Sequence, residues 1–136
     1  MKDFSYYCSL PDSMSEGELY IEFLGVVESG ADTKCNKFDV VNVLLELSDR
    51  QWHTYTILCD SLRSDLESIL ISYWDGSDLE FVEGAIAITA RLGLVGFFNF
   101  ILAQDFKVLS LEVAEEIRGA IAEFGDSVGD PYSGVQ

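Results

Sequence analysis

Histidine, cysteine and positive charge are all scarce in this sequence, and each scarcity excludes a class of site. There is one histidine, His53, and there are three cysteines, Cys8, Cys35 and Cys59, which lie far apart and form no CxxC motif. A structural zinc site needs four clustered Cys or His ligands, and an odd number of cysteines does not suit a disulfide framework. We therefore expect reduced, mostly buried thiols, no bound metal ion and no cofactor.

Motifs that carry catalysis are also missing. Nucleophilic catalysis needs a base beside the nucleophile, but His53 stands in a β-like run with no flanking hydrolase motif. Neither GxGxxG nor the GxxxxGK phosphate loop occurs. The acidic run from Asp75 to Glu80 has its glycine at the second position, whereas a calcium-binding EF-hand loop needs one at the sixth. The sequence thus predicts a protein that is not an enzyme and has no catalytic residues.

No long hydrophobic run is free of interruption. The best candidate, residues 85–103, is about long enough to span a bilayer. Arg91 lies inside it and would cost about 2.5–3.5 kcal/mol at the centre of a membrane helix, and Gly93 and Gly96 interrupt it further. We interpret the run as two buried elements of a soluble core. The start of the chain is polar and aromatic rather than signal-like, which predicts a cytoplasmic protein.

Core-forming material, in contrast, is plentiful. Hydrophobic residues make up 49% of the 136 positions and aromatic residues 12%, well above the composition of disordered chains. The length fits one domain, and neither a repeat nor a long linker divides it. We predict a single domain over residues 1–136, in which residues 126–136 form a flexible tail.

Apolar spacing and capping signals predict helices in the second half of the chain. Ser64 with Glu67, and Ser77 with Glu80, have the spacing of capping boxes ahead of apolar stripes. Ser110 is expected to cap the last helix. The predicted buried residues of these helices are Leu66, Ile69, Leu70, Ile86, Phe97, Phe98, Ile101, Leu102, Ile117 and Ile121.

The first half of the chain is ambiguous. Residues 4–10 alternate apolar and polar side chains and predict a short strand that ends at Pro11. Ser15 and Glu18 form a further capping box for a helix, whereas residues 52–58 again alternate as a strand would. The sequence as a whole predicts a mainly α protein with helical bundle-like packing and a minor β element in the N-terminal half. An α+β fold is the alternative.

Negative charge is the strongest compositional signal. Acidic residues outnumber basic ones by 24 to 8, which gives a net charge of −16. A magnitude of roughly 2–8 suits a small domain, and self-repulsion at higher charge destabilises the compact state. The acids stand in blocks without bases, one of them between Arg63 and Arg91, so neutralising i, i+4 pairs are missing. An ordinary acidic surface is one interpretation, and a surface that binds a basic protein is the other.

Nucleic acids and anionic membranes are disfavoured as partners, because Lys and Arg supply those contacts. The predicted partner-binding residues are Trp74, Asp75, Asp78, Glu80 and Glu83. An aromatic side chain among carboxylates has the composition of an interface hot spot with a charged rim. Trp74 as a core residue, and the acidic blocks near either end of the chain as the interface, remain open.

In size, acidity, lack of motifs and helical pattern over the whole chain, the sequence resembles bacterial immunity proteins, including those of contact-dependent growth inhibition and colicin systems. The resemblance carries over no individual residue. It implies an inhibitor that neutralises a cognate toxin, such as a basic nuclease. Two alternatives are a nucleic-acid-mimic inhibitor of the anti-restriction or anti-CRISPR type, and a small ligand-binding protein.

Overall fold

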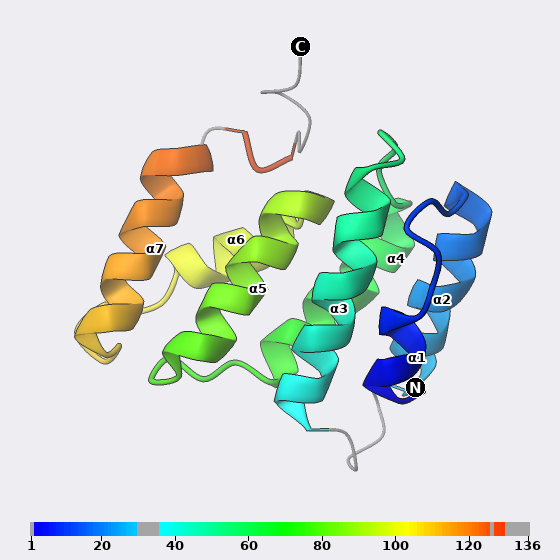
Figure 1. Ribbon diagram of the computed structural model, residues 1–136. Helices are drawn as coiled ribbons and strands as arrows, with labels where there is room; N and C mark the ends of the chain where they lie inside the picture. Colours follow the sequence, from blue (N-terminus) through cyan, green and yellow to red (C-terminus); the bar gives the residue numbers. More distant parts are fainter. Residues whose placement is uncertain (1, 30–35, 126, 130–136) are drawn as a thin grey trace.

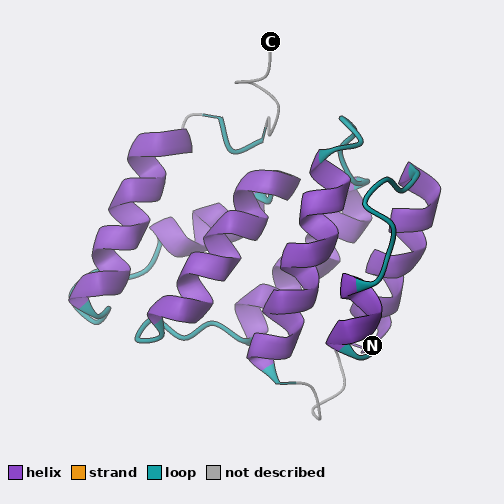
Figure 2. Cartoon of the chain, in the orientation of Figure 1, coloured by secondary structure: helices purple, strands orange, loops and turns teal. Residues whose placement is uncertain are grey.

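The computed structural model describes residues 2–29, 36–125 and 127–129. Within these ranges the chain forms seven α-helices and no strand (Figure 2). The prediction of a mainly α protein is therefore confirmed, and the minor β element is not found in the described residues. The helices are α1 (Phe4–Cys8), α2 (Glu16–Ser29), α3 (Lys37–Trp52), α4 (Asp60–Ser72), α5 (Leu79–Leu92), α6 (Val95–Leu102) and α7 (Leu111–Phe124).

The helices alternate between two rows along the chain. The odd-numbered helices α1, α3, α5 and α7 contact one another in order, and α2, α4 and α6 do the same. Figure 1 shows α4 and α6 behind α3 and α5, with α7 at one end and α1 and α2 at the other. Contacts of α2 with α3, and of α5 with α6, join the rows. Every helix except α2 thus packs chiefly against a helix two places along the chain, as stacked helix pairs do in α-solenoids, while α2 packs mainly against α3.

The core lies between the rows and takes buried side chains from all seven helices. Eight of the ten residues predicted to be buried are buried, whereas Leu102 and Ile121 are 43% and 40% exposed. Leu102 is the last residue of α6, and Ile121 lies on α7, the end of its row. Both positions fit an apolar stripe, but no helix covers them. The largest fully buried side chains include Tyr7, Phe23, Phe81, Phe97, Leu44, Leu47, Leu66, Leu70, Ile88 and Leu92.

Two of the predicted helix starts are confirmed by their hydrogen bonds. The Ser15 amide donates to the Glu18 carboxylate at 3.0 Å, and the Glu18 amide donates to Ser15 Oγ at 3.2 Å. Ser110 Oγ accepts from the Val113 amide at 3.2 Å and caps α7. In both cases the serine directly precedes the first residue of the helix, as the capping signal in the sequence predicts.

The other two predicted capping boxes are wrong. Helix α4 begins at Asp60, so Ser64 lies inside it, and the Glu67 carboxylate accepts instead from the Phe97 amide of α6 at 2.7 Å. Helix α5 is capped by Asp78, whose carboxylate accepts from the Phe81 amide at 3.2 Å. Helix α5 is thus capped by the residue after Ser77, and the N-cap of α4, Cys59, makes no capping hydrogen bond with its side chain.

Residues 4–10 do not form the predicted strand, because α1 occupies Phe4–Cys8. The helix buries Tyr7, and the Tyr6 hydroxyl donates to the Glu22 carboxylate at 2.8 Å. A lone strand here would have no partner strand to complete its backbone hydrogen bonds. Residues 53–58 likewise form a turn and a loop after α3, rather than a strand.

The apolar run at residues 85–103 is divided as predicted. Helix α5 ends at Leu92, its C-cap residue Gly93 has a φ of 71° in the left-handed region, and α6 begins at Val95. No described helix is both long and apolar enough to cross a membrane. Gly84, inside α5, lets this helix lie close to α3, since a Cβ on Gly84 would stand 2.5 Å from Val41 Cγ1 of α3.

Two further predictions concern the cysteines and the C-terminal tail. Cys8 and Cys59 are exposed, so the predicted burial is wrong for these thiols, while Cys35 lies outside the described residues. Of the predicted tail at residues 126–136, only residues 127–129 are described, and Val128 among them is buried.

Candidate protein-binding surface

Asp75 and Asp78, two of the predicted binding residues, lie close together in the loop between α4 and α5, where both bind groups of the same chain. The Asp75 carboxylate accepts from the amide of Ser77 at 3.0 Å and from its hydroxyl at 2.7 Å. Lys37 Nζ, at the start of α3, lies 3.1 Å from Asp75 Oδ2 and 2.9 Å from Asp78 Oδ2. These two carboxylates therefore fasten the loop to α3, and Asp78 also caps α5.

Trp74 faces an aromatic cluster rather than open solvent. Its ring is half-buried and lies edge-on to Phe81, Phe97 and Phe100, with centroid distances of 6.4, 6.2 and 5.6 Å. Edge-to-face contacts at such distances stabilise aromatic cores. The geometry favours the core alternative for Trp74, which leaves the predicted surface without its anchor.

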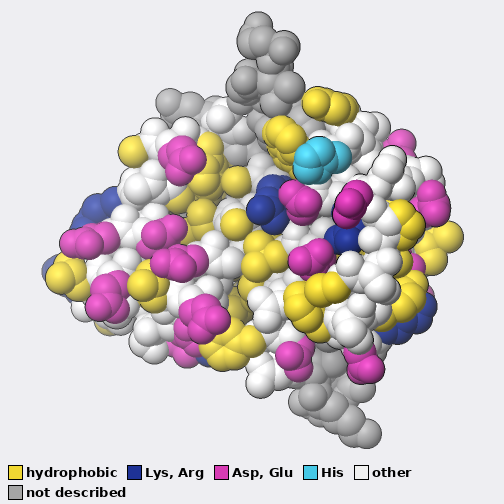
Figure 3. Space-filling view, in the orientation of Figure 1, with side chains coloured by type: hydrophobic (Ala, Val, Ile, Leu, Met, Phe, Trp, Pro, Cys, Tyr) yellow, Lys and Arg dark blue, Asp and Glu magenta, His cyan; other side chains and the backbone are white. Residues whose placement is uncertain are grey.

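Glu80 and Glu83 are exposed on α5, and three exposed glutamates lie on the neighbouring helix α7: Glu112, Glu115 and Glu123. We call these five residues the α5–α7 acidic face. Within the described ranges, no Lys or Arg forms an ion pair with any of them. Figure 3 shows acidic side chains spread over this part of the molecule. The last two predicted residues thus belong to a wider negative surface.

A second acidic area lies at the far end of α3. Asp12, Glu46 and Asp49, together with Arg50 and His53, line an open pocket of about 290 Å³. His53 Nδ1 lies 2.7 Å from the Asp49 carbonyl oxygen and 4.0 Å from its carboxylate. In the described part of the chain, no three His, Cys, Asp or Glu side chains converge as metal ligands would.

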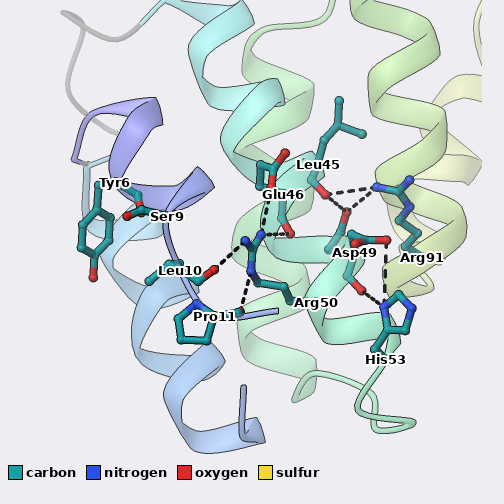
Figure 4. A network of polar contacts seen from close by, with 11 residues as sticks. Tyr6, Ser9, Leu10, Pro11, Leu45, Glu46, Asp49, Arg50, His53 and Arg91 are labelled. Atoms are coloured by element: carbon teal, nitrogen blue, oxygen red, sulfur yellow. Dashed lines mark hydrogen bonds and ion pairs between the residues drawn. The ribbon is translucent and has the colours of Figure 1, made fainter. Parts of the chain in front are cut away.

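Positive charge near this pocket is turned inward (Figure 4). The Arg50 side chain is 6% exposed and donates to the carbonyl oxygens of Leu10 and Pro11, both at 3.0 Å. It also binds the Glu46 carbonyl at 3.1 Å and the Glu46 carboxylate at 2.9 Å. Arg91 donates to the Leu45 carbonyl oxygen at 3.1 Å. Arg91 thus joins α5 to α3, and Arg50 joins α3 to the segment between α1 and α2.

Sequence reasoning missed the segment beside that pocket. Tyr55 has a φ of 58°, the one positive φ among the described residues other than glycine, and its side chain is 63% exposed. A left-handed backbone costs a residue with a Cβ about 1–2 kcal/mol. The Trp52 ring lies edge-on to His53 at 5.4 Å and 6.3 Å from the Tyr55 ring. The segment therefore presents aromatic rings at the surface despite local strain.

Comparison with known proteins identifies no relative of this chain. No protein-family model matches it, and neither a curated protein nor a solved structure matches it. The function must therefore be argued from the charge and geometry described above.

The Asp75 network gives a testable dependence on pH. The Ser77 hydroxyl, followed by the Ser77 amide and Lys37, lowers the pKa of Asp75 from 3.8 to about 2. A carboxyl whose pKa is lowered by folding contributes stability that is complete above its unfolded pKa and is lost as the pH falls through its folded pKa. We therefore expect Asp75→Asn to lower the melting temperature at pH 6, by a difference that shrinks between about pH 4 and pH 2. Circular dichroism melts across this range measure it.

Asp65 supplies the control for that experiment, since it is exposed on α4 and makes no ion pair among the described residues. Asp65→Asn should leave the pH profile of the melting temperature parallel to that of the wild type. A difference between Asp75→Asn and wild type that stays constant from pH 6 to pH 2 would contradict the assignment.

Proposed function

We propose that this protein binds and neutralises a basic protein partner, as an immunity protein does with its cognate toxin. The observation that carries the proposal is the imbalance of the outer surface. In the described ranges, Lys or Arg pairs with only four carboxylates, those of Asp75, Asp78, Glu46 and Asp60. Most of the other acidic side chains in these ranges form no ion pair with Lys or Arg.

The electrostatic repulsion within such a surface also supports the proposal of a basic partner. Like charges held close together on a folded chain destabilise the folded state, and a partner with a cationic face relieves that repulsion on binding. A nuclease toxin has such a face where it holds phosphates. Carboxylates placed against it accelerate encounter and compete with the nucleic acid, and association of this kind reaches about 10⁸–10⁹ M⁻¹s⁻¹ at low salt.

The test replaces charge at the α5–α7 acidic face without disturbing the fold. Glu80 and Glu83 are suitable because neither makes an ion pair in the described structure, whereas Asp78 caps α5. We expect the double variant Glu80→Lys/Glu83→Lys to associate about tenfold more slowly with a basic nuclease toxin domain at low salt, because rim charges chiefly govern the association rate. Surface plasmon resonance at two salt concentrations measures the rate and its salt dependence.

A matched double variant changes the same charge elsewhere. Glu16→Lys/Asp65→Lys alters two exposed acids on the even-numbered row, and we expect it to slow association much less. If the α5–α7 variant binds every such domain at the wild-type rate at both salt concentrations, this face is not the interface. Preferential binding to a restriction or CRISPR nuclease would favour the nucleic-acid-mimic alternative.

A further inference from the structure

We propose that the segment formed by Trp52, His53, Tyr55 and Ile57, which we call the aromatic loop, is the anchor of the partner interface and receives an arginine-bearing segment of the basic partner. The inference rests on the proposed function and names the side chains that would hold the partner once charge has brought it close. It moves the anchor from Trp74, which the aromatic core uses, to a part of the surface that adjoins the second acidic area.

The loop displays apolar surface to solvent. Tyr55 is 63% exposed and Ile57 41%, and the His53 side chain is 60% exposed. Tyrosine and tryptophan are enriched among residues that dominate binding energy, because a rigid ring buries a large area with few rotatable bonds. A surface of this composition has the character of an interface centre.

The loop is also held in one conformation before any partner arrives. The Gln51 side chain is 1% exposed, and its Nε2 donates to the carbonyl oxygen of Thr56 at 3.0 Å, to Thr56 Oγ1 at 3.2 Å and to Thr54 Oγ1 at 3.3 Å. Thr54 Oγ1 in turn donates to the Gln51 carbonyl oxygen at 2.7 Å. These bonds keep Tyr55 in its left-handed conformation. A preformed loop loses little conformational entropy on binding, which raises affinity.

Charge on the neighbouring pocket decides what kind of side chain fits. Asp12, Glu46 and Asp49 line that pocket beside His53, and the Asp49 side chain is 59% exposed. The Arg50 guanidinium is committed to internal acceptors. A partner side chain that lies over the rings and reaches the carboxylates must therefore be cationic and flat. Arginine meets both conditions, because its guanidinium stacks on aromatic faces and binds carboxylates with two parallel hydrogen bonds.

Hexa-arginine and hexa-lysine peptides are the probes that test this assignment, followed by ¹H–¹⁵N NMR titration of the full chain. We expect hexa-arginine to bind more tightly and to shift the Trp52 indole and Tyr55 amide signals. Tyr55→Gly should weaken hexa-arginine binding about three- to fivefold and remove most of the preference over hexa-lysine. Glycine suits a φ of 58°. The melting temperature of this variant should therefore fall by no more than a few degrees relative to the wild type.

The controls separate the anchor from the general charge. Tyr20→Ala removes a tyrosine that is 43% exposed on α2 and should leave both affinities within twofold. Asp49→Asn should weaken both peptides and reduce the preference for arginine. If Tyr55→Gly binds hexa-arginine as the wild type does while Glu80→Lys/Glu83→Lys binds it more weakly, the anchor is wrong and the proposed function stands. If none of these acidic or aromatic variants weakens binding, both are wrong.

Discussion

Truncating Phe98 to alanine is expected to lower the free energy of unfolding by about 3–5 kcal/mol. Phe98 lies on α6, is 4% exposed, and its ring centroid is 5.7 Å from that of Phe124 on α7. The substitution removes a large apolar side chain from a site with neighbours from two helices, so the cavity cannot close without moving one of them. Urea denaturation followed by circular dichroism gives the change directly.

Leu102 on the same helix is the control, because its side chain is 43% exposed. Leu102→Ala should cost less than about 1 kcal/mol, since little apolar area is removed from a buried site. If Phe98→Ala and Leu102→Ala lower the free energy of unfolding equally, Phe98 is not buried and Leu102 exposed as described.

Replacing Arg50 with methionine is expected to lower the free energy of unfolding by about 2–4 kcal/mol. Each hydrogen bond to a charged group contributes about 1.5–3 kcal/mol, and the Arg50 guanidinium makes four, two of them to the carbonyl oxygens of Leu10 and Pro11. The value is smaller than the sum because Pro11 is exposed and water can replace part of the loss. Chemical denaturation measures the change, and hydrogen exchange should show faster exchange in α1.

Two further substitutions are the controls for Arg50→Met. Arg50→Lys keeps the charge but has three donors on a single nitrogen, so it cannot keep all four hydrogen bonds and should recover less than half of the loss. Arg118→Met removes an arginine that is exposed on α7 and stacks on Phe106 at 5.3 Å, and it should cost less than about 1 kcal/mol. If Arg50→Met and Arg118→Met destabilise the protein equally, Arg50 does not tie the segment after α1 to α3.

The existence of the helices in the second half could be predicted, because the apolar spacing matches the buried faces, although two of the predicted starts are wrong. Leu66 and Leu70 stand one helical turn apart and are both fully buried, and the Ser110 cap coincides with the start of α7. The alternation in residues 4–10 misled, because it places Tyr7 on the polar face of a strand, whereas Tyr7 is the residue that α1 buries. Short segments take their structure from what they pack against.

The candidate surface was harder to predict, since its key contacts join distant parts of the chain. Lys37 and Asp75 are separated by 38 positions, so nothing in the sequence near Asp75 shows that its charge is neutralised. The left-handed conformation of Tyr55 depends on the buried amide of Gln51, which sequence periodicity does not reveal. The two aromatic residues Trp52 and Tyr55, three positions apart, are the one feature of the sequence that indicates this surface, and the alternating pattern of residues 52–58 led to their interpretation as part of a strand.

The alternation of helices between two rows has a consequence for how the molecule opens. Helices α1 and α7 stand at opposite ends (Figure 1), and α7 packs chiefly against α5. In such a stack the terminal helix can detach while the remaining helices stay folded, so hydrogen exchange and proteases reach it first. A partner that holds α5 and α7 together would close this end of the stack. Binding at the acidic face would then lengthen the lifetime of the folded protein itself.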